Sequence, residues 1–155
     1  MLVLMFRVAD DLYAIRAGRV VEVVPQVALR ALPHAPEFLT GLFDYRGRVV
    51  PVIDLGLLMG RRACQPRLST RIIVVDAALQ PATERHLLGL VAEQVSDVKR
   101  FDDAQVIFPP MDLEQARYLG TIVRADEGLV QVIEVERVLT DTLRNALFGK
   151  MTEAR

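Results

Sequence analysis

The sequence is poor in the residues on which most small catalytic and metal-binding domains depend. Its 155 residues include one cysteine, Cys64, together with two histidines and no tryptophan. A single cysteine excludes an internal disulfide bond and fits a reducing compartment, and so few sulfur and imidazole ligands argue against a structural zinc site. We therefore expect a cytoplasmic protein that requires no metal or other cofactor.

Neither sign of charge predominates, and no long apolar run is present. Nineteen basic and 20 acidic side chains leave a formal net charge of −1, whereas a nucleic-acid-binding protein normally has a basic excess. No apolar stretch reaches the roughly 18 residues of a membrane-spanning helix, and the first residues, MLVLMFRV, lack the basic start of a signal peptide. We expect neither nucleic-acid binding nor direct membrane insertion.

The charges are unevenly placed in one segment. No acid occurs between Asp54 and Asp76, where four arginines fall at positions 61, 62, 67 and 71. Such a segment is either a solvated basic loop or a contact surface for an acidic partner. The sequence leaves both interpretations open.

Short valine-rich runs predict an all-β fold. They cover residues 2–8, 20–24, 49–55, 71–75, 87–92, 119–124 and 129–135. Most are bounded by turn-forming residues, and Asp10-Asp11 and residues 126–128 are placed as hairpin turns. Because no helical pattern of about 10 residues regularly separates the runs, a barrel or sandwich is favoured over a βαβ arrangement.

Two segments depart from the strand pattern. Residues 36–40 precede Gly41 and could form a helical turn between two strands. Residues 136–148 carry apolar side chains at helical spacing, and Gly149 follows as a candidate C-terminal cap. We expect one C-terminal helix that covers the end of a barrel.

The sequence also contains an approximate internal repeat. Residues 15–23 align with 90–98 at an offset of 75, and residues 49–55 align with 129–135 at an offset of 80. This period indicates two duplicated units, each with about five strands, enough for a small barrel. We expect a single domain over residues 1–150, two lobes that meet near residues 60–69, and a tail at 151–155.

No group of residues points to catalysis. His34 and His86 have no partner motif, and Cys64 lacks the flanking residues of a nucleophile. The acid pairs at 10–11 and 102–103 fall in turn contexts, and no glycine-rich phosphate-binding pattern occurs. We expect a protein that is not an enzyme and that acts through its surfaces, as modules with barrel seams and exposed sheet edges do.

Residues 35–55, APEFLTGLFDYRGRVVPVIDL, closely resemble the signature of CheW-like coupling proteins of bacterial chemosensory arrays. The matching positions are Pro36, Phe38, Leu39, Gly41, Leu42, Arg46, Gly47, Pro51, Asp54 and Leu55. Residues 6–23, 89–98 and 120–138 resemble further family segments, so the similarity extends from residue 2 to about 148.

The resemblance implies two five-stranded SH3-like barrels and a non-enzymatic adaptor. Proteins of this family connect the cytoplasmic tips of chemoreceptors to a CheA-type histidine kinase. The sequence does not choose between flagellar chemotaxis and another chemosensory pathway. The alternative is a stand-alone regulatory module that binds a kinase or phosphatase without contacting a receptor.

Five positions match family residues at the receptor or kinase interface: Val20, Glu22, Gly41, Arg46 and Val98. We expect an ion pair between Glu22 and Arg46, worth about 3–5 kcal/mol if partly buried and about 0–1 kcal/mol if exposed. Val20, Gly41 and Val98 match positions near a receptor-binding groove, although core packing or a positive φ would also explain them.

Two departures from the family pattern concern turns. Asp44 replaces the usual asparagine, and a carboxylate cannot donate to a backbone carbonyl as an amide can. Glu93-Gln94 replaces an Asp-Gly type of turn. We expect both turns to be held differently here.

Overall fold

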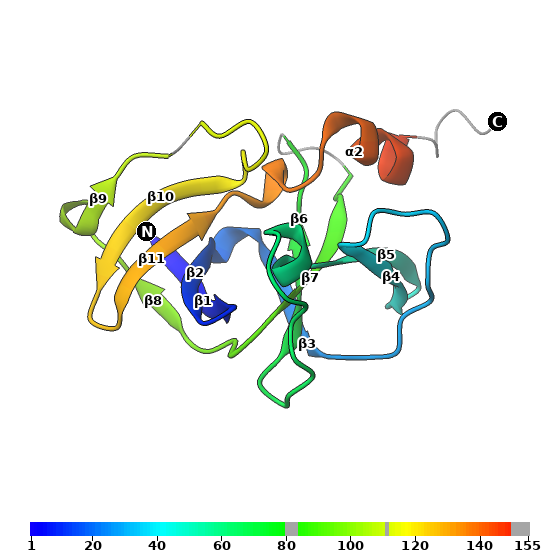
Figure 1. Ribbon diagram of the computed structural model, residues 1–155, viewed down its shortest axis with the longest axis horizontal. Helices are drawn as coiled ribbons and strands as arrows, with labels where there is room; N and C mark the ends of the chain where they lie inside the picture. The colour runs from blue at the N-terminus through cyan, green and yellow to red at the C-terminus, as the bar shows by residue number, and fades with distance from the viewer. Residues whose placement is uncertain (80–83, 111, 150–155) are drawn as a thin grey trace.

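The computed structural model describes residues 1–79, 84–110 and 112–149, and these form two β-sheets (Figure 1). The six-stranded sheet has the order β8-β1-β2-β11-β10-β9, and the five-stranded sheet has the order β3-β6-β7-β5-β4. The strands are β1 (Leu2–Val8), β2 (Asp11–Arg16), β3 (Val20–Pro25), β4 (Leu39–Tyr45), β5 (Arg48–Asp54), β6 (Arg71–Asp76), β7 (Leu87–Ala92), β8 (Val98–Arg100), β9 (Val106–Phe108), β10 (Leu119–Ala125) and β11 (Gly128–Ile133). The all-β prediction is confirmed, although one sheet has six strands instead of five.

The tight hairpins lie within one residue of the predicted turns, since the first uses Ala9-Asp10 and Asp11 already begins β2. Ala9 and Asp10 have φ values of 48° and 74° between β1 and β2, the left-handed pair that suits a two-residue hairpin turn. Gly128, with φ 134°, begins β11 directly after the Asp126-Glu127 turn. Residues 36–40 do not form the expected helical turn. A single reverse turn, closed by Leu39 N donating to the carbonyl of Pro36 at 3.0 Å, leads into β4.

The boundary between the two sequence repeats is not the boundary between the two sheets. Residues 60–69 connect β5 to β6, and both strands belong to the five-stranded sheet. The chain instead crosses between sheets at η1 (Ala17–Arg19) and at residues 93–97. Each repeat therefore contributes its first hairpin to the sheet of the other repeat. Residues 60–69 join the two repeats, but each sheet takes strands from both, so the boundary between the halves of the duplication stays a prediction.

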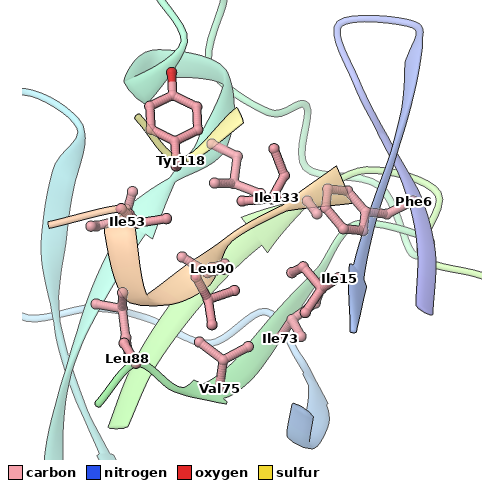
Figure 2. Packing of buried hydrophobic residues seen from close by; sticks show 14 of the residues in the cluster. Phe6, Ile15, Ile53, Ile73, Val75, Leu88, Leu90, Tyr118 and Ile133 are labelled. Atoms are coloured by element: carbon pink, nitrogen blue, oxygen red, sulfur yellow. The ribbon is translucent and has the colours of Figure 1, made fainter. Parts of the chain in front are cut away.

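One hydrophobic core joins the two sheets. Phe6, Ile15 and Ile133 of the six-stranded sheet pack in the same buried cluster as Ile73 and Leu90 of the five-stranded sheet (Figure 2). Smaller clusters lie within the six-stranded sheet and within the five-stranded sheet. Because each buried aliphatic or aromatic side chain contributes about 1.5–3 kcal/mol, the shared cluster makes the two lobes one packed unit.

The C-terminal helix is present but shorter than predicted. A 3-10 turn, η3 (Val135–Arg137), precedes α2 (Asp141–Phe148). The Thr140 side chain begins the helix by accepting a bond from Leu143 N at 3.2 Å. Gly149 follows at the cap position with φ −77°, which is helical backbone and not the left-handed conformation typical of a glycine cap. The predicted tail at 151–155 lies outside the described residues.

Candidate functional site

Glu22 joins the two edge strands of the five-stranded sheet. Its Oε1 accepts a hydrogen bond from the Tyr45 hydroxyl at 2.5 Å and an ion-paired bond from Arg46 Nη2 at 2.9 Å. Glu22 lies on β3 and Tyr45 ends β4, the strands at opposite edges. The sheet therefore curls until its edges meet, as a small barrel requires. We call these three residues the Glu22 cluster.

The hairpin turn after β4 orients Arg46. Arg46 and Gly47 have φ values of 52° and 84°, so the turn uses left-handed backbone at both central positions. Asp44 Oδ1 accepts a bond from Gly47 N at 2.8 Å. The carboxylate thus holds the turn as an acceptor, which explains why aspartate serves here in place of asparagine.

The Glu22 cluster is partly exposed to solvent, and Arg46 is its most exposed member. The Arg46 side chain is 74% exposed and that of Glu22 is 37% exposed, so the exposed case of the predicted ion pair applies, at about 0–1 kcal/mol. The hydrogen bond to Glu22 raises the pKa of Tyr45 above its ordinary value. The Arg46 guanidinium also lies 5.5 Å from the centre of the Tyr45 ring. This arrangement orders polar groups at the surface and adds little to stability.

Gly41 is buried and required by a close backbone contact. It has φ 157°, and a Cβ at this position would lie 2.6 Å from the carbonyl oxygen of Arg30. Arg30 and Leu42 exchange backbone bonds of 2.8 and 2.9 Å, which hold that segment against β4. Gly41 therefore shapes the strand from inside and does not itself offer an exposed contact.

The remaining candidate residues lie on different sheets. Val20 begins β3, two residues before Glu22, and packs partly against the shared core. Val98 begins β8 on the six-stranded sheet and is 52% exposed. The structure thus places Val20, Glu22, Gly41 and Arg46 on one sheet, brings Glu22 and Arg46 into contact, and leaves Val98 on the other sheet.

The surroundings of Cys64 do not favour a nucleophilic thiol. Burial raises the pKa of the Cys64 thiol to about 12, and the nearby Asp54 carboxylate adds to this effect. A thiol with so high a pKa is a poor nucleophile at neutral pH. No three His, Cys, Asp or Glu side chains gather as a metal site in the described ranges. No helix within those ranges combines the length and apolarity needed to cross a bilayer.

Comparison with known proteins identifies the family. The model of the CheW-like domain matches residues 2–143. The chain belongs to the CheW-like domain family. A solved structure of the scaffolding protein TtCheW from Thermoanaerobacter tengcongensis superimposes with a TM-score of 0.77 at 26% identity, covering 90% of this chain and 87% of that one.

Curated relatives of this CheW-like chain come from several bacteria. A probable chemotaxis protein CheW of Rhizobium etli is 26% identical over 140 residues, covering 88% of this chain and 86% of its own length. Protein FrzA of Myxococcus xanthus is also 26% identical, over 145 residues, with 92% and 87% covered. These names support a chemosensory adaptor, do not favour a stand-alone regulatory module, and do not single out one pathway.

Sequence analysis missed Tyr45 and the partners of the basic segment. Tyr45 precedes Arg46 in the hairpin, but nothing local indicates that the end of β4 would meet β3. Likewise, Arg61, in the segment between β5 and β6, pairs with Asp11 at the start of β2 at 3.2 Å. Both contacts join segments far apart in the sequence, so only the curvature and packing of the sheets reveal them.

Proposed function

We propose that this CheW-like chain couples the cytoplasmic tips of chemoreceptors to a CheA-type histidine kinase, in the cytoplasm and without catalytic activity. The observation that carries the proposal is the Glu22 cluster. Arg46 stands on a left-handed turn and its side chain is 74% exposed, yet it is held in place by an ion pair to Glu22 on β3. An exposed ion pair contributes little to folding, so its ordering is better explained by recognition of a partner.

Two valines extend this surface in different ways. Val98 is an exposed apolar side chain on β8, an edge strand, and a helical receptor tip would bury it by helix-in-groove contact. Val20 is half-buried beside the shared core and would contribute through its exposed part. Gly41 would act indirectly, because it sets the path of β4 toward Arg46.

Charge reversal at Arg46 tests this function. The Arg46→Glu variant should retain its fold but bind the kinase or the receptor cytoplasmic domain at least about tenfold more weakly, as a lost charged contact worth about 1.4 kcal/mol does. Arg124→Glu is the matched control, because Arg124 is an exposed arginine on β10 of the other sheet. Isothermal titration with purified receptor and kinase domains measures both affinities.

Either of two results would count against the proposal. Unchanged affinity for both proteins in the Arg46→Glu variant would remove the role of the Glu22 cluster. Binding of the kinase by the unsubstituted protein with no binding of any receptor domain would favour a stand-alone regulatory module instead.

A further inference from the structure

The connection from α1 (Leu55–Leu58) to β6 projects away from the two sheets (Figure 1). The connection contains three arginines, two of which form ion pairs within the molecule, while Arg71 is already the first residue of β6. Arg61 pairs with Asp11 at 3.2 Å, and Arg62 lies 3.8 Å from Asp10 and 3.6 Å from Glu93. These pairs bind the base of the connection to the six-stranded sheet and to the chain crossing after β7. Arg61 and Arg62 of the predicted basic segment therefore have a structural role.

Backbone bonds anchor the next part of the connection at two points. Gln65 N donates to Glu93 Oε2 at 2.8 Å. Val95 N donates to the carbonyl of Ser69 at 3.1 Å. Glu93 is itself buried, with 8% of its surface exposed, and a buried carboxylate with partners is costly to disturb. Residues 65 and 69 are thus held in place from both sides. We call residues 65–70 the loop tip.

Internal bonds order the loop tip as well. Arg67 N donates to the carbonyl of Gln65 at 2.9 Å, and Thr70 N donates to the carbonyl of Arg67 at 3.0 Å. The buried Thr70 hydroxyl donates to the same Gln65 carbonyl at 2.6 Å. A segment tied this closely loses little conformational entropy when it binds a partner.

At its apex this ordered segment displays an apolar side chain. Leu68 is 98% exposed. A single exposed leucine is ordinary on a protein surface, but this one is presented on a rigid turn between the exposed Arg67 and Arg71. In the described part of the chain, no carboxylate forms an ion pair with Arg67 or Arg71. The loop tip therefore combines an apolar anchor with the positive charge of Arg67, and Arg71 at the start of β6 adds a second one beside it.

Beside the loop tip lies a hollow of about 480 Å³. Its walls include Ser69 from the tip and the apolar side chains of Phe6, Leu12 and Val95. A partner protein that binds Leu68 would lie next to this hollow. One of the partner's side chains could then fill the hollow. In protein interfaces, a few side chains that are buried in pockets of the partner contribute most of the binding free energy.

We propose that the loop tip is a second docking element, which inserts Leu68 into an apolar pocket rimmed by carboxylates on an acidic partner protein. The proposal rests on the coupling function above and assigns one of the two coupled proteins to this element. The Arg46 hairpin precedes β5 in the chain, whereas the loop tip begins at residue 65, after both β5 and α1. The loop tip is thus an element separate from the Glu22 cluster, and it would supply a second contact.

Titrations with two defined probes test the proposal. The receptor cytoplasmic domain and the CheA-type kinase are each titrated into the full chain, into Leu68→Ser and into Arg67→Glu. We expect both variants to lose about tenfold in affinity for the same probe, and Arg67→Glu to show a weaker dependence on salt. Leu129→Ser is the matched control, because Leu129 is 55% exposed on the other sheet, and it should bind both probes normally.

Each other result overturns a stated part of the account. If the unsubstituted chain binds the probes and both loop-tip variants bind equally well, the docking element is overturned and the coupling function stands. If the unsubstituted chain binds neither probe, the coupling function falls, and the docking element falls with it. If Leu68→Ser abolishes a dimer seen by sedimentation, the occupant is a second copy and the acidic partner is ruled out.

Discussion

At the scale of single residues, the Glu22 side chain both links two strands of the sheet and positions a charged group at the surface. One carboxylate oxygen accepts from both Tyr45 and Arg46. The bond from Tyr45 closes the sheet, while the bond from Arg46 fixes an exposed cation. Because the acceptor is charged and shared, its substitution should change the chemistry of Tyr45 more than the stability of the fold.

Replacing Glu22 with glutamine should lower the pKa of Tyr45 toward its ordinary value of 10.0. Glu22 raises that pKa because its negative charge and hydrogen bond favour the protonated phenol. The corresponding stability is present below pH 10 and is lost as the pH rises through the folded-state pKa. Ultraviolet titration of phenolate formation measures the change, with Tyr45→Phe identifying the signal. An unchanged titration curve in Glu22→Gln would show that the bond is absent in solution.

Cys64 should react slowly with alkylating agents. Its pKa of about 12 keeps the thiol protonated at pH 8, and we expect alkylation at least about 100-fold slower than in the denatured protein. Because the folded-state pKa lies above the model value of 9.0, the stability from the buried thiol should fall between about pH 9 and pH 12. Mass spectrometry after timed exposure to iodoacetamide measures the rate. Folded-state alkylation as fast as in denaturant would contradict this environment.

At the scale of elements, the strands show what local pattern can and cannot predict. β1 and β7 have the predicted bounds because continuous apolar runs mark strands buried on both faces. β4 was missed because Gly41 and Asp44 interrupt its pattern, and β8 and β9 because they have only three residues each. The exchange of hairpins between repeats was missed because strand pairing is non-local.

Gly41→Ala should destabilise the protein by about 1–3 kcal/mol, the usual cost of forcing atoms into a packed site. The added Cβ would meet the Arg30 carbonyl at 2.6 Å, and the backbone there is not the type that side chains favour. Gly18→Ala is the control, since nothing lies within 4 Å of its Cβ position. Chemical denaturation measures both. Equal stability of the two variants would mean that the Arg30 segment does not pack against β4.

Arg144 should prove the main attachment of α2. Its guanidinium is buried and donates to the carbonyls of Ala77 at 2.7 Å and Glu136 at 2.6 Å. Arg144→Leu leaves these acceptors unpaired, so we expect a loss of about 1–3 kcal/mol per buried acceptor that water cannot reach. The exposed Thr142→Ala should change stability by less than about 0.5 kcal/mol. Thermal unfolding compares them, and equal melting temperatures would contradict the attachment.

At the scale of the whole molecule, the shared core makes two lobes into a rigid body. Phe6 and Leu90 lie in one cluster although they belong to different sheets, so the lobes cannot turn independently without exposing apolar surface. Rigidity of this kind holds the Glu22 cluster and the loop tip at a fixed separation. An adaptor that transmits a signal between two proteins depends on such a fixed geometry.

The candidate site could be predicted only in part, because some of its contacts depend on how distant segments fold together. Glu22 and Arg46 could be paired from the family pattern, since both positions match its signature. Whether the pair is buried could not be predicted, because exposure depends on how far the sheet curls. The ties of Arg62 to Asp10 and Glu93 likewise depend on two chain crossings that no local pattern marks.

The coupling function is measured most directly as receptor-dependent activation of the kinase. Kinase autophosphorylation is measured with receptor cytoplasmic domains present, with and without this protein, and with its Arg46→Glu variant. We expect the unsubstituted protein to raise the rate only when receptor is present, and Arg46→Glu to lose most of this increase while remaining folded. The same rate with and without the protein, under conditions where receptor and kinase are both saturated with it, would contradict the coupling function.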